Sequence, residues 1–281
     1  MKSIFEIKSM RNFSNSWLGA GKTIALVPTM GNLHQGHISL LDRAKQIADK
    51  TIVSIFVNPI QFGMGEDYEN YPSTLDDDLS KLNDLGIDMA FLPNLAELYP
   101  GGTETDTRVS VPQISDTLCG EYRKGHFSGV ATVVSKLLIN SRPNYVLFGE
   151  KDYQQLLVIK RMITDLILPV EVIAMPTFRE SDGLAMSSRN QYLTAEQRGK
   201  AGIIYRTLNT AEKALVNKVP IDKIEQKGKL DLEKAGMKVE YFSVRRQDDL
   251  LNADSRDKSL IVLTAAWLGA ARLIDNIKVQ L

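Results

Sequence analysis

The stretch "TIALVPTMGNLHQGHISLLDRAKQIADKTIVSIFVN", residues 23–58, decides the fold. It begins with an apolar, partly β-branched run (23–30) and ends with a second one (51–58), each typical of a buried strand. Between them, residues 37–49 carry apolar side chains at positions 38, 40, 41, 44, 47 and 48, which is helical spacing. The three segments predict a βαβ unit, whose right-handed crossover makes the two strands parallel.

The same alternation continues along the chain. We predict further helices at 74–86, 129–140 and 152–167 and further strands at 87–93, 144–149 and 170–176. Alternating strands and helices of this kind are typical of α/β proteins with a parallel sheet. The sequence therefore predicts a Rossmann-like, doubly wound parallel sheet in a first domain, residues 1–176.

The pattern changes after about residue 176. A polar, glycine-containing loop (179–190) precedes one long predicted helix (194–216) and a second helix at about 221–235. The stretches "KVEYFSV" and "SLIVLTAAWLGAARLIDNI" then read as strands joined by a tight turn. We expect a second, smaller α+β domain, residues 177–281.

Composition narrows the class of protein. The 281 residues are 43% hydrophobic and 24% charged, as in an ordinary globular protein, and 34 basic residues balance 34 acidic ones, which gives no sign of a nucleic-acid-binding surface. The single cysteine, Cys119, excludes an internal disulfide framework, fits a reducing cytoplasm and is expected to be incidental to catalysis. No run approaches the roughly 18 apolar residues of a membrane span, and "MKSIFEIKSM" lacks an apolar targeting segment. We expect a cytoplasmic protein.

Two of the three histidines, His34 and His37, lie where the first strand gives way to a helix. Ligands of open α/β sheets bind beyond the carboxyl ends of strands, and a helix N-terminus favours phosphate. Gly31 and Gly36 allow the backbone to approach a ligand closely. Two imidazoles there are suited to stabilise charge on a phosphate in a transition state, at about 2.7–4 kcal/mol per donor. The alternatives are two polar residues at a helix start, or a zinc site completed by His126.

Several motifs carry a resemblance to a known family. "LHQGH" resembles the HIGH-type signature of the nucleotidyltransferase superfamily, and "MSSRN" (186–190) stands in the place of its KMSKS-like loop. The chain is similar to the pantothenate synthetase (pantoate–β-alanine ligase) family in motifs that run in order from about residue 24 to 277. These are "PTMGNLHQGHISL", "FVNPIQF" (56–62), "GHFSGVATVVSKL" (125–137), "FGEKDYQQL" (148–156), "DGLAMSSRNQYL" (182–193) and "LIDNI" (273–277).

The resemblance implies a reaction in two steps. The carboxylate of pantoate attacks the α-phosphate of ATP, which acts with Mg2+, to give pantoyl adenylate and pyrophosphate. The amine of β-alanine then attacks the activated carbonyl to give pantothenate and AMP. No enzyme nucleophile is required, so catalysis is positioning and charge stabilisation. The resemblance also implies a homodimer and a smaller domain that covers the active site.

The resemblance further implies the residues of the site, with His37 as the main catalytic donor. The catalytic residues implied are His37, His34, Lys151 and Arg189. The ATP site implied comprises Met30, Gly31, His34, His37, Gly149, Lys151, Asp152, Phe178, Met186, Ser187, Ser188 and Arg189. The substrate site implied comprises Met30, Gln61, Gln155, Arg123 and His126. The magnesium ligands stay unassigned, since Asp152 suits either ribose hydroxyls or Mg2+.

Four features depart from this scheme or leave it open. "STLDDDL" (73–79) suits a helix start, which we favour, but also a magnesium site. Ser73 stands where the family usually has a basic residue, and Lys124, where it tends to have proline, is expected to loosen its loop. Phe178 replaces an expected small aliphatic residue, so only a backbone contact is implied there.

Three other functions compete with the ligase. A cofactor adenylyltransferase of the same superfamily would keep the adenylate on its product. A nucleotide-sensing module would bind ATP without turnover, and a metal hydrolase would use the three histidines as ligands.

Overall fold

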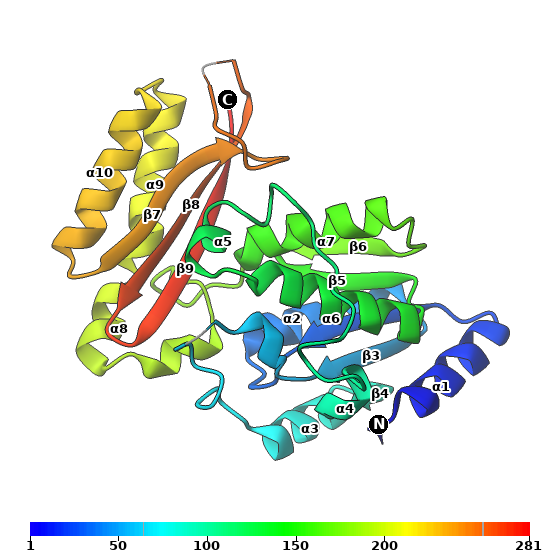
Figure 1. Ribbon diagram of the computed structural model, residues 1–281. Helices are drawn as coiled ribbons and strands as arrows, with labels where there is room; N and C mark the ends of the chain where they lie inside the picture. The colour runs from blue at the N-terminus through cyan, green and yellow to red at the C-terminus, as the bar shows by residue number, and fades with distance from the viewer. Residues whose placement is uncertain (64, 255) are drawn as a thin grey trace. The chain divides into compact units, whose positions relative to one another are not determined.

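A computed structural model describes residues 1–63, 65–254 and 256–281 (Figure 1). The chain divides into two compact units: Met1–Glu150 with Val158–Pro176, and Lys151–Leu157 with Thr177–Leu281. Among the described residues, no helix combines the length and the apolar character needed to cross a membrane.

The first unit is built on a six-stranded sheet in which every neighbouring pair of strands is parallel. The strands, in sheet order, are β1 (Lys2–Ile4), β4 (Met89–Phe91), β3 (Lys50–Ile55), β2 (Ile24–Thr29), β5 (Tyr145–Gly149) and β6 (Glu171–Met175). The central strands are almost entirely buried, as expected for a parallel sheet covered on both faces. The predicted doubly wound sheet is confirmed.

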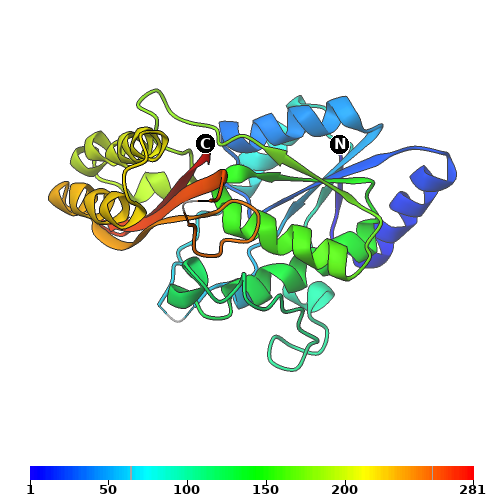
Figure 2. The same cartoon turned by 90° about the horizontal axis from the view of Figure 1, so that it is seen from above.

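Helices cover both faces of this sheet (Figure 2). On one face, α2 (Gln35–Ile47) and α3 (Leu75–Asp84) share a core with β2, β3 and β4. On the other face, α1 (Ile7–Gly19) lies against α6 (His126–Ser141). The remaining helical segments near the sheet are α4 (Leu95–Leu98), α5 (Cys119–Tyr122), α7 (Tyr153–Asp165) and the 3₁₀ turns η1 (Pro59–Gln61) and η2 (Glu150–Asp152).

Strand order positions the site. The chain leaves β2 towards β3 on one side and leaves β5 towards β6 on the other, while β2 and β5 are neighbours in the sheet. The carboxyl ends of β2 and β5, at Thr29 and Gly149, therefore flank the point where the winding reverses. Open α/β sheets bind their ligands at this switch point.

The second unit contains a three-stranded antiparallel sheet, β7 (Lys238–Arg246), β8 (Ser259–Leu268) and β9 (Ala271–Gln280). Helices α9 (Ile203–Val216) and α10 (Ile221–Lys234) pack on one face of it and enclose an apolar core (Figure 1). The shorter helical segments are η3 (Ser188–Tyr192) and α8 (Ala195–Ala201). The predicted smaller α+β part is confirmed.

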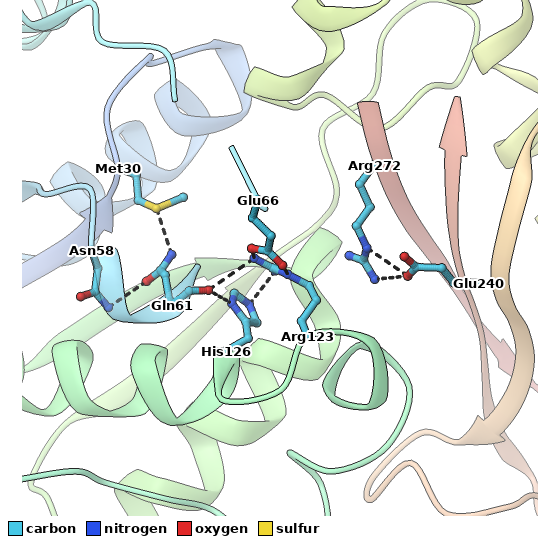
Figure 3. Close-up of polar contacts among 8 residues, drawn as sticks. All are labelled: Met30, Asn58, Gln61, Glu66, Arg123, His126, Glu240 and Arg272. Atoms are coloured by element: carbon cyan, nitrogen blue, oxygen red, sulfur yellow. Dashed lines mark hydrogen bonds and ion pairs between the residues drawn. The ribbon is translucent and has the colours of Figure 1, made fainter. Parts of the chain in front are cut away.

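A largely buried ion pair links the three strands of the small sheet. Glu240 of β7 accepts from Trp267 Nε1 of β8 at 2.6 Å. It also accepts from Arg272 Nη2 of β9 at 2.6 Å, a contact drawn in Figure 3. It lies where a register shift between Val239 and Tyr241 interrupts the ladder. Side-chain bonds hold the strands together at the position where the backbone ladder is irregular.

One prediction about the elements was wrong, and two N-terminal elements were missed. The single helix predicted at 194–216 is two helices, because the chain bends at Gly202, where a Cβ would lie 2.8 Å from Asp182 Oδ2. Glycine lowers helix propensity and admits the neighbouring loop. The N-terminal β1 and α1 were missed, because β1 is short and exposed and α1 buries only Met10 and Ser14.

Candidate active site

The loop after β2 has a left-handed backbone held by a buried carboxylate. Gly31 and Asn32 have φ angles of +83° and +51°. The backbone N–H groups of Asn32 and Leu33 donate to Asp78 Oδ2 and Oδ1 at 2.7 and 2.8 Å. A Cβ on Gly31 would lie 3.1 Å from Asp78 Oδ2, so the glycine admits this carboxylate. Asp78 is 0% exposed, so its two hydrogen bonds to the loop are shielded from water and hold the loop in this conformation.

Asp78 belongs to the acidic stretch 73–79, for which two interpretations were open. Helix α3 does begin there, with Thr74 at its N-cap. The Thr74 hydroxyl, however, donates to Asp78 Oδ2 at 3.3 Å and makes no capping bond to the backbone. The predicted helix start is confirmed, and its third acidic residue holds the histidine loop.

His34 and His37 lie at the start of α2 with their rings in contact, the centroids 4.0 Å apart and the ring planes tilted by 33°. The backbone N–H of His34, at the N-cap, donates to His37 Nδ1 at 3.3 Å. A neutral imidazole that accepts at Nδ1 carries its proton on Nε2. His37 is thereby set as an Nε2–H donor at a helix N-terminus, where anions bind.

Gln61 is the centre of a second cluster of polar contacts, drawn in Figure 3. The residue is 8% exposed and ends the 3₁₀ turn that follows β3. Its Oε1 accepts from Asn58 Nδ2 at 3.2 Å, and its Nε2 donates to Met30 Sδ at 2.9 Å. Tyr99 in turn donates to Asn58 Oδ1 at 2.9 Å. The Gln61 amide is therefore held in one orientation, with a weak sulfur acceptor as the partner of its NH2 group.

Arg123 and His126 hold the backbone of Gln61. His126 Nδ1 lies 2.7 Å from the Gln61 carbonyl oxygen, and Arg123 Nη2 donates to the same oxygen at 3.4 Å. Arg123 Nη1 lies 3.0 Å from His126 Nε2. Because arginine only donates, neutral His126 accepts at Nε2 and donates from Nδ1. Both predicted substrate residues thus lie in the Gln61 cluster.

Glu66 completes the cluster. Its two carboxylate oxygens accept from Arg123 Nε and Nη2, both at 2.6 Å, in a fork-shaped pair. Burial favours the neutral acid, but the hydrogen bonds and charge of Arg123 outweigh it and lower the pKa of Glu66. Glu66 and Asn58 were missed at the sequence level. A glutamate in the polar loop "GMGEDYENYP" resembles a solvated side chain, whereas Asn58 lay inside a quoted motif and could have been found there.

The other predicted residues of the strand end follow β5. Gly149 ends that strand, and a Cβ placed on it would meet no atom of the described residues within 4 Å. In the second unit, Lys151 Nζ lies 3.8 Å from Asp152 Oδ1, with side chains 18% and 45% exposed. Gln155, in the first turn of α7, is partly buried, beside the buried Gln154.

The loop that holds the remaining predicted residues is firmly attached within the second unit. Phe178 accepts from Met186 N at 2.9 Å through its carbonyl, and its side chain is 42% exposed. Arg198 of α8 pairs with both Glu180 and Asp182 at 2.6 Å, which lowers the pKa of Asp182. Ser187 caps η3 by accepting from Arg189 N at 3.3 Å, so Met186, Ser187, Ser188 and Arg189 stand on an ordered turn.

The remaining sequence-level alternatives can be placed as well. In the part of the chain that the structure describes, no three His, Cys, Asp or Glu side chains are grouped to hold a metal ion, and His126 instead faces Gln61 and Arg123. Lys124 and Ser73 are exposed, and the turn around Lys124 keeps its His126 N to Arg123 O hydrogen bond of 3.1 Å. Cys119 is buried at the start of α5.

Comparison with known proteins identifies the family. Residues 2–278 match the pantoate-beta-alanine ligase family. The chain belongs to the pantoate-beta-alanine ligase family. It is 47% identical to the pantothenate synthetase of Pseudomonas fluorescens (strain SBW25) over 287 residues, covering 100% of both chains. It is 50% identical to that of Methylococcus capsulatus over 266 residues, covering 94% of this chain and 93% of the relative.

Solved structures agree with this assignment. The chain resembles a crystal structure of pantothenate synthetase from Thermus thermophilus with a TM-score of 0.91 and 38% identity, covering 99% of each chain. It resembles pantoate-beta-alanine ligase from Francisella tularensis, complexed with beta-gamma ATP and beta-alanine, with a TM-score of 0.83 and 36% identity, covering 99% and 97%. The family, the fold and the activity expected from the sequence are confirmed: the chain is an ATP-dependent pantoate–β-alanine ligase.

Proposed function

We propose that the histidine loop binds ATP and that the Gln61 cluster binds pantoate and β-alanine, as the resemblance implies. The observation that carries this proposal is the position of Met30. It directly precedes the histidine loop, and its sulfur accepts from Gln61 Nε2 at 2.9 Å. The loop suited to phosphate and the amide suited to pantoate therefore adjoin within one unit. A substrate oxygen that replaces the weak sulfur acceptor gives Gln61 a better hydrogen bond.

The first step is adenylation. A carboxylate oxygen of pantoate forms a bond to the α-phosphorus of ATP, and the bond to the β,γ-pyrophosphate breaks. His37 donates from Nε2, and His34 and the free N–H groups of α2 add to the positive potential, as negative charge gathers on the phosphate oxygens. Lys151 and Arg189 neutralise the departing pyrophosphate, and Ser187 and Ser188 offer hydroxyl donors. Met186, the backbone of Phe178, Gly31 and Gly149 complete the nucleotide site.

In the second step the amine of β-alanine attacks the carbonyl carbon of pantoyl adenylate, and AMP leaves with the electrons of the broken C–O bond. The protein supplies position: Gln61 and Gln155 hold the pantoyl group through neutral amides, which donate and accept. Arg123 and His126 act chiefly on Gln61, whose carbonyl they hold. Glu66 neutralises the positive charge of Arg123, which would otherwise be unpaired near the reacting amine.

Mg2+ is proposed to enter with ATP. Magnesium is commonly held by one or two carboxylates together with substrate phosphates. Asp152 fits this role as a partly exposed carboxylate beside Lys151 at the start of α7, and a bond to the ribose is its alternative. When bound, the ion neutralises phosphate charge.

We also propose the wider organisation that the resemblance implies. Residues 1–176 form the nucleotide- and pantoate-binding domain, apart from Lys151–Leu157, which group with the second unit, and residues 177–281 form a smaller domain that covers the site. The enzyme is a cytoplasmic homodimer, and a single, buried cysteine, Cys119, is compatible with a reducing compartment. Sedimentation equilibrium tests the dimer, and a concentration-independent mass of about one chain contradicts it.

Release of AMP tests the site assignment. With ATP and magnesium, AMP and pantothenate should form in equal amounts only when pantoate and β-alanine are both present. His37→Gln should lower turnover about 10²–10³-fold, the effect of losing one donor to a transition-state oxyanion. Free AMP without pantoate dependence, or adenylate retained on the final product, contradicts the scheme. An unchanged turnover in His37→Gln revives a nucleotide-sensing role.

A further inference from the structure

The motif "LIDNI" at residues 273–277 has no role in the reaction as described above, yet it connects two segments of the proposed ATP site. Asp275 and Asn276 lie on β9 in the second unit, 4% and 6% exposed. Burying a polar side chain costs free energy unless the side chain is hydrogen-bonded, so both residues require partners. These partners belong to the two segments of the proposed ATP site.

Asp275 holds the base of the loop that carries Met186 to Arg189. Arg179 Nη1 donates to Asp275 Oδ2 at 2.6 Å and Nη2 donates to Oδ1 at 3.0 Å. Arg179 also donates to the carbonyl of Gly183 at 3.0 Å and lies 3.9 Å from the ring centroid of Tyr205. Since Arg179 pairs with Ala185 in a β-bridge, the loop is closed at its base and fixed to β9.

Asn276 reaches the other segment. Its Nδ2 donates to the backbone carbonyl of Lys151 at 3.0 Å, while its own N–H donates to Asp275 Oδ1 at 2.8 Å and its carbonyl accepts from Arg179 Nη2 at 3.3 Å. Burial raises the pKa of the Asp275 carboxyl, and Arg179 and the nearby charge of Lys151 oppose that shift. Two adjacent residues thus bind both Lys151 and the 179–189 loop.

We propose that Asp275 and Asn276 are positioning residues for adenylation, holding Lys151 and the 179–189 loop in one rigid frame. The two segments then present their phosphate-binding groups to ATP as a single set. This inference rests on the proposed ATP-binding roles of Lys151 and Arg189. Lysine carries its charge on a flexible stem, so fixing its backbone reduces the freedom lost on binding phosphate. A purely structural role for the pair would instead affect folding alone.

A double-mutant cycle between Asn276→Ala and Lys151→Met tests the proposal in the full-length enzyme. Asn276→Ala should lower kcat/KM for ATP roughly 3- to 10-fold, the effect of one lost buried hydrogen bond, and leave KM for β-alanine unchanged. In the Lys151→Met background the same change should have less than about a twofold effect, because the ammonium group that the Asn276 hydrogen bond positions is gone. Glu225→Gln is the matched control. That carboxylate joins α10 to Val244 N of β7 at 2.7 Å in the same unit, and its loss should leave ATP kinetics unchanged.

Three outcomes overturn the proposal. One is an equal effect of Asn276→Ala with and without Lys151, and another is a loss of thermal stability with no change in ATP kinetics. The third is a Lys151→Met enzyme with unchanged ATP kinetics, which would show that the proposed role of Lys151 itself is wrong. Should Asn276→Ala not fold, Asp275→Asn, which keeps the volume, carries the same cycle against Arg189→Met.

Discussion

At the scale of single residues, Gln61 shows how a neutral amide is given one orientation. Its side-chain oxygen is bound by Asn58, and its backbone carbonyl is bound by His126 and Arg123. An amide that is free to rotate would present donor and acceptor alike to a substrate. Because the side-chain oxygen is already bound, the NH2 group is the part of the amide that can donate to a substrate carboxylate or hydroxyl.

Removing this amide should weaken pantoate binding. We expect Gln61→Ala to lower kcat/KM for pantoate about 10- to 100-fold, since a buried partner left unsatisfied costs about 1–3 kcal/mol. KM for ATP should change little. Steady-state kinetics with each substrate varied in turn measure both. Gln46→Ala, on the exposed side of α2, is the control, and an equal loss for ATP and pantoate argues against the assignment.

The ion pair between Glu66 and Arg123 makes the stability of the fold depend on pH in the acid range. Because its pKa is lowered in the folded protein, its ion pair with Arg123 stabilises the fold above the ordinary glutamate pKa of about 4.3. That contribution is lost as the pH falls through the lowered pKa. At pH 7, Glu66→Gln should therefore cost about 1–3 kcal/mol in the free energy of unfolding.

Urea unfolding of wild type and Glu66→Gln between pH 7 and pH 3 measures this difference. The gap between the two proteins should narrow as the pH decreases below about 4.3. A gap that stays constant over that range would mean that the carboxylate charge contributes nothing. Glu121→Gln, an exposed residue near the same turn, should show no gap.

At the scale of elements, α3 shapes the loop at the start of α2. Asp78 of α3 accepts two backbone N–H groups of the loop, and Lys81 Nζ donates to the carbonyl of Leu33 at 2.9 Å. We expect Asp78→Ala to reduce the free energy of unfolding by about 1–3 kcal/mol, because it leaves buried donors unsatisfied. It should also lower kcat/KM for ATP.

The neighbouring Asp77, which is exposed, supplies the control for this prediction. Asp77→Ala should leave ATP kinetics within experimental error of wild type and should reduce stability less than Asp78→Ala does. If Asp78→Ala reduced stability but left ATP kinetics unchanged, the conformation of the loop would not matter for nucleotide binding, and the prediction would be wrong.

The end of β5 allows a test of the nucleotide site that leaves the fold intact. A Cβ on Gly149 would meet no atom of the described residues within 4 Å, and its φ is not positive, so the fold itself tolerates alanine. We expect Gly149→Ala to unfold at the wild-type temperature and to raise KM for ATP severalfold. Gly19→Ala, with equally open space at the end of α1, should leave KM for ATP unchanged.

The sequence predicted the elements of the core better than those at the edges. Continuous apolar runs predicted β2 and β3 correctly, because a parallel sheet buries both faces of its strands. β1 and α1 were missed because they bury few side chains, and the break at Gly202 depends on Asp182, which is 20 positions earlier in the chain. The quoted motifs contain Gln61 and His126, and the resemblance added Arg123. The pairing of Glu66 with Arg123, however, joins residues that are 57 positions apart and leaves no local pattern.

At the scale of the whole molecule, nucleotide binding should increase the free energy of unfolding. A ligand that binds only the folded state adds about 2.7 kcal/mol to the free energy of unfolding at a hundredfold excess over its Kd. A non-hydrolysable ATP analogue with magnesium should therefore raise Tm, and Lys151→Met should reduce that shift. Scanning calorimetry with and without the analogue measures it. An undiminished shift in Lys151→Met would remove Lys151 from the site.

The scarcity of histidine has a practical consequence for spectroscopy. The chain has three histidines: two lie at the start of α2, and the third, His126, is hydrogen-bonded to the backbone carbonyl of Gln61. An imidazole NMR spectrum of this enzyme is consequently a spectrum of its candidate active site, with no background from elsewhere. Each added substrate can then be assigned to the loop or to the cluster by which resonances move, without any substitution in the protein.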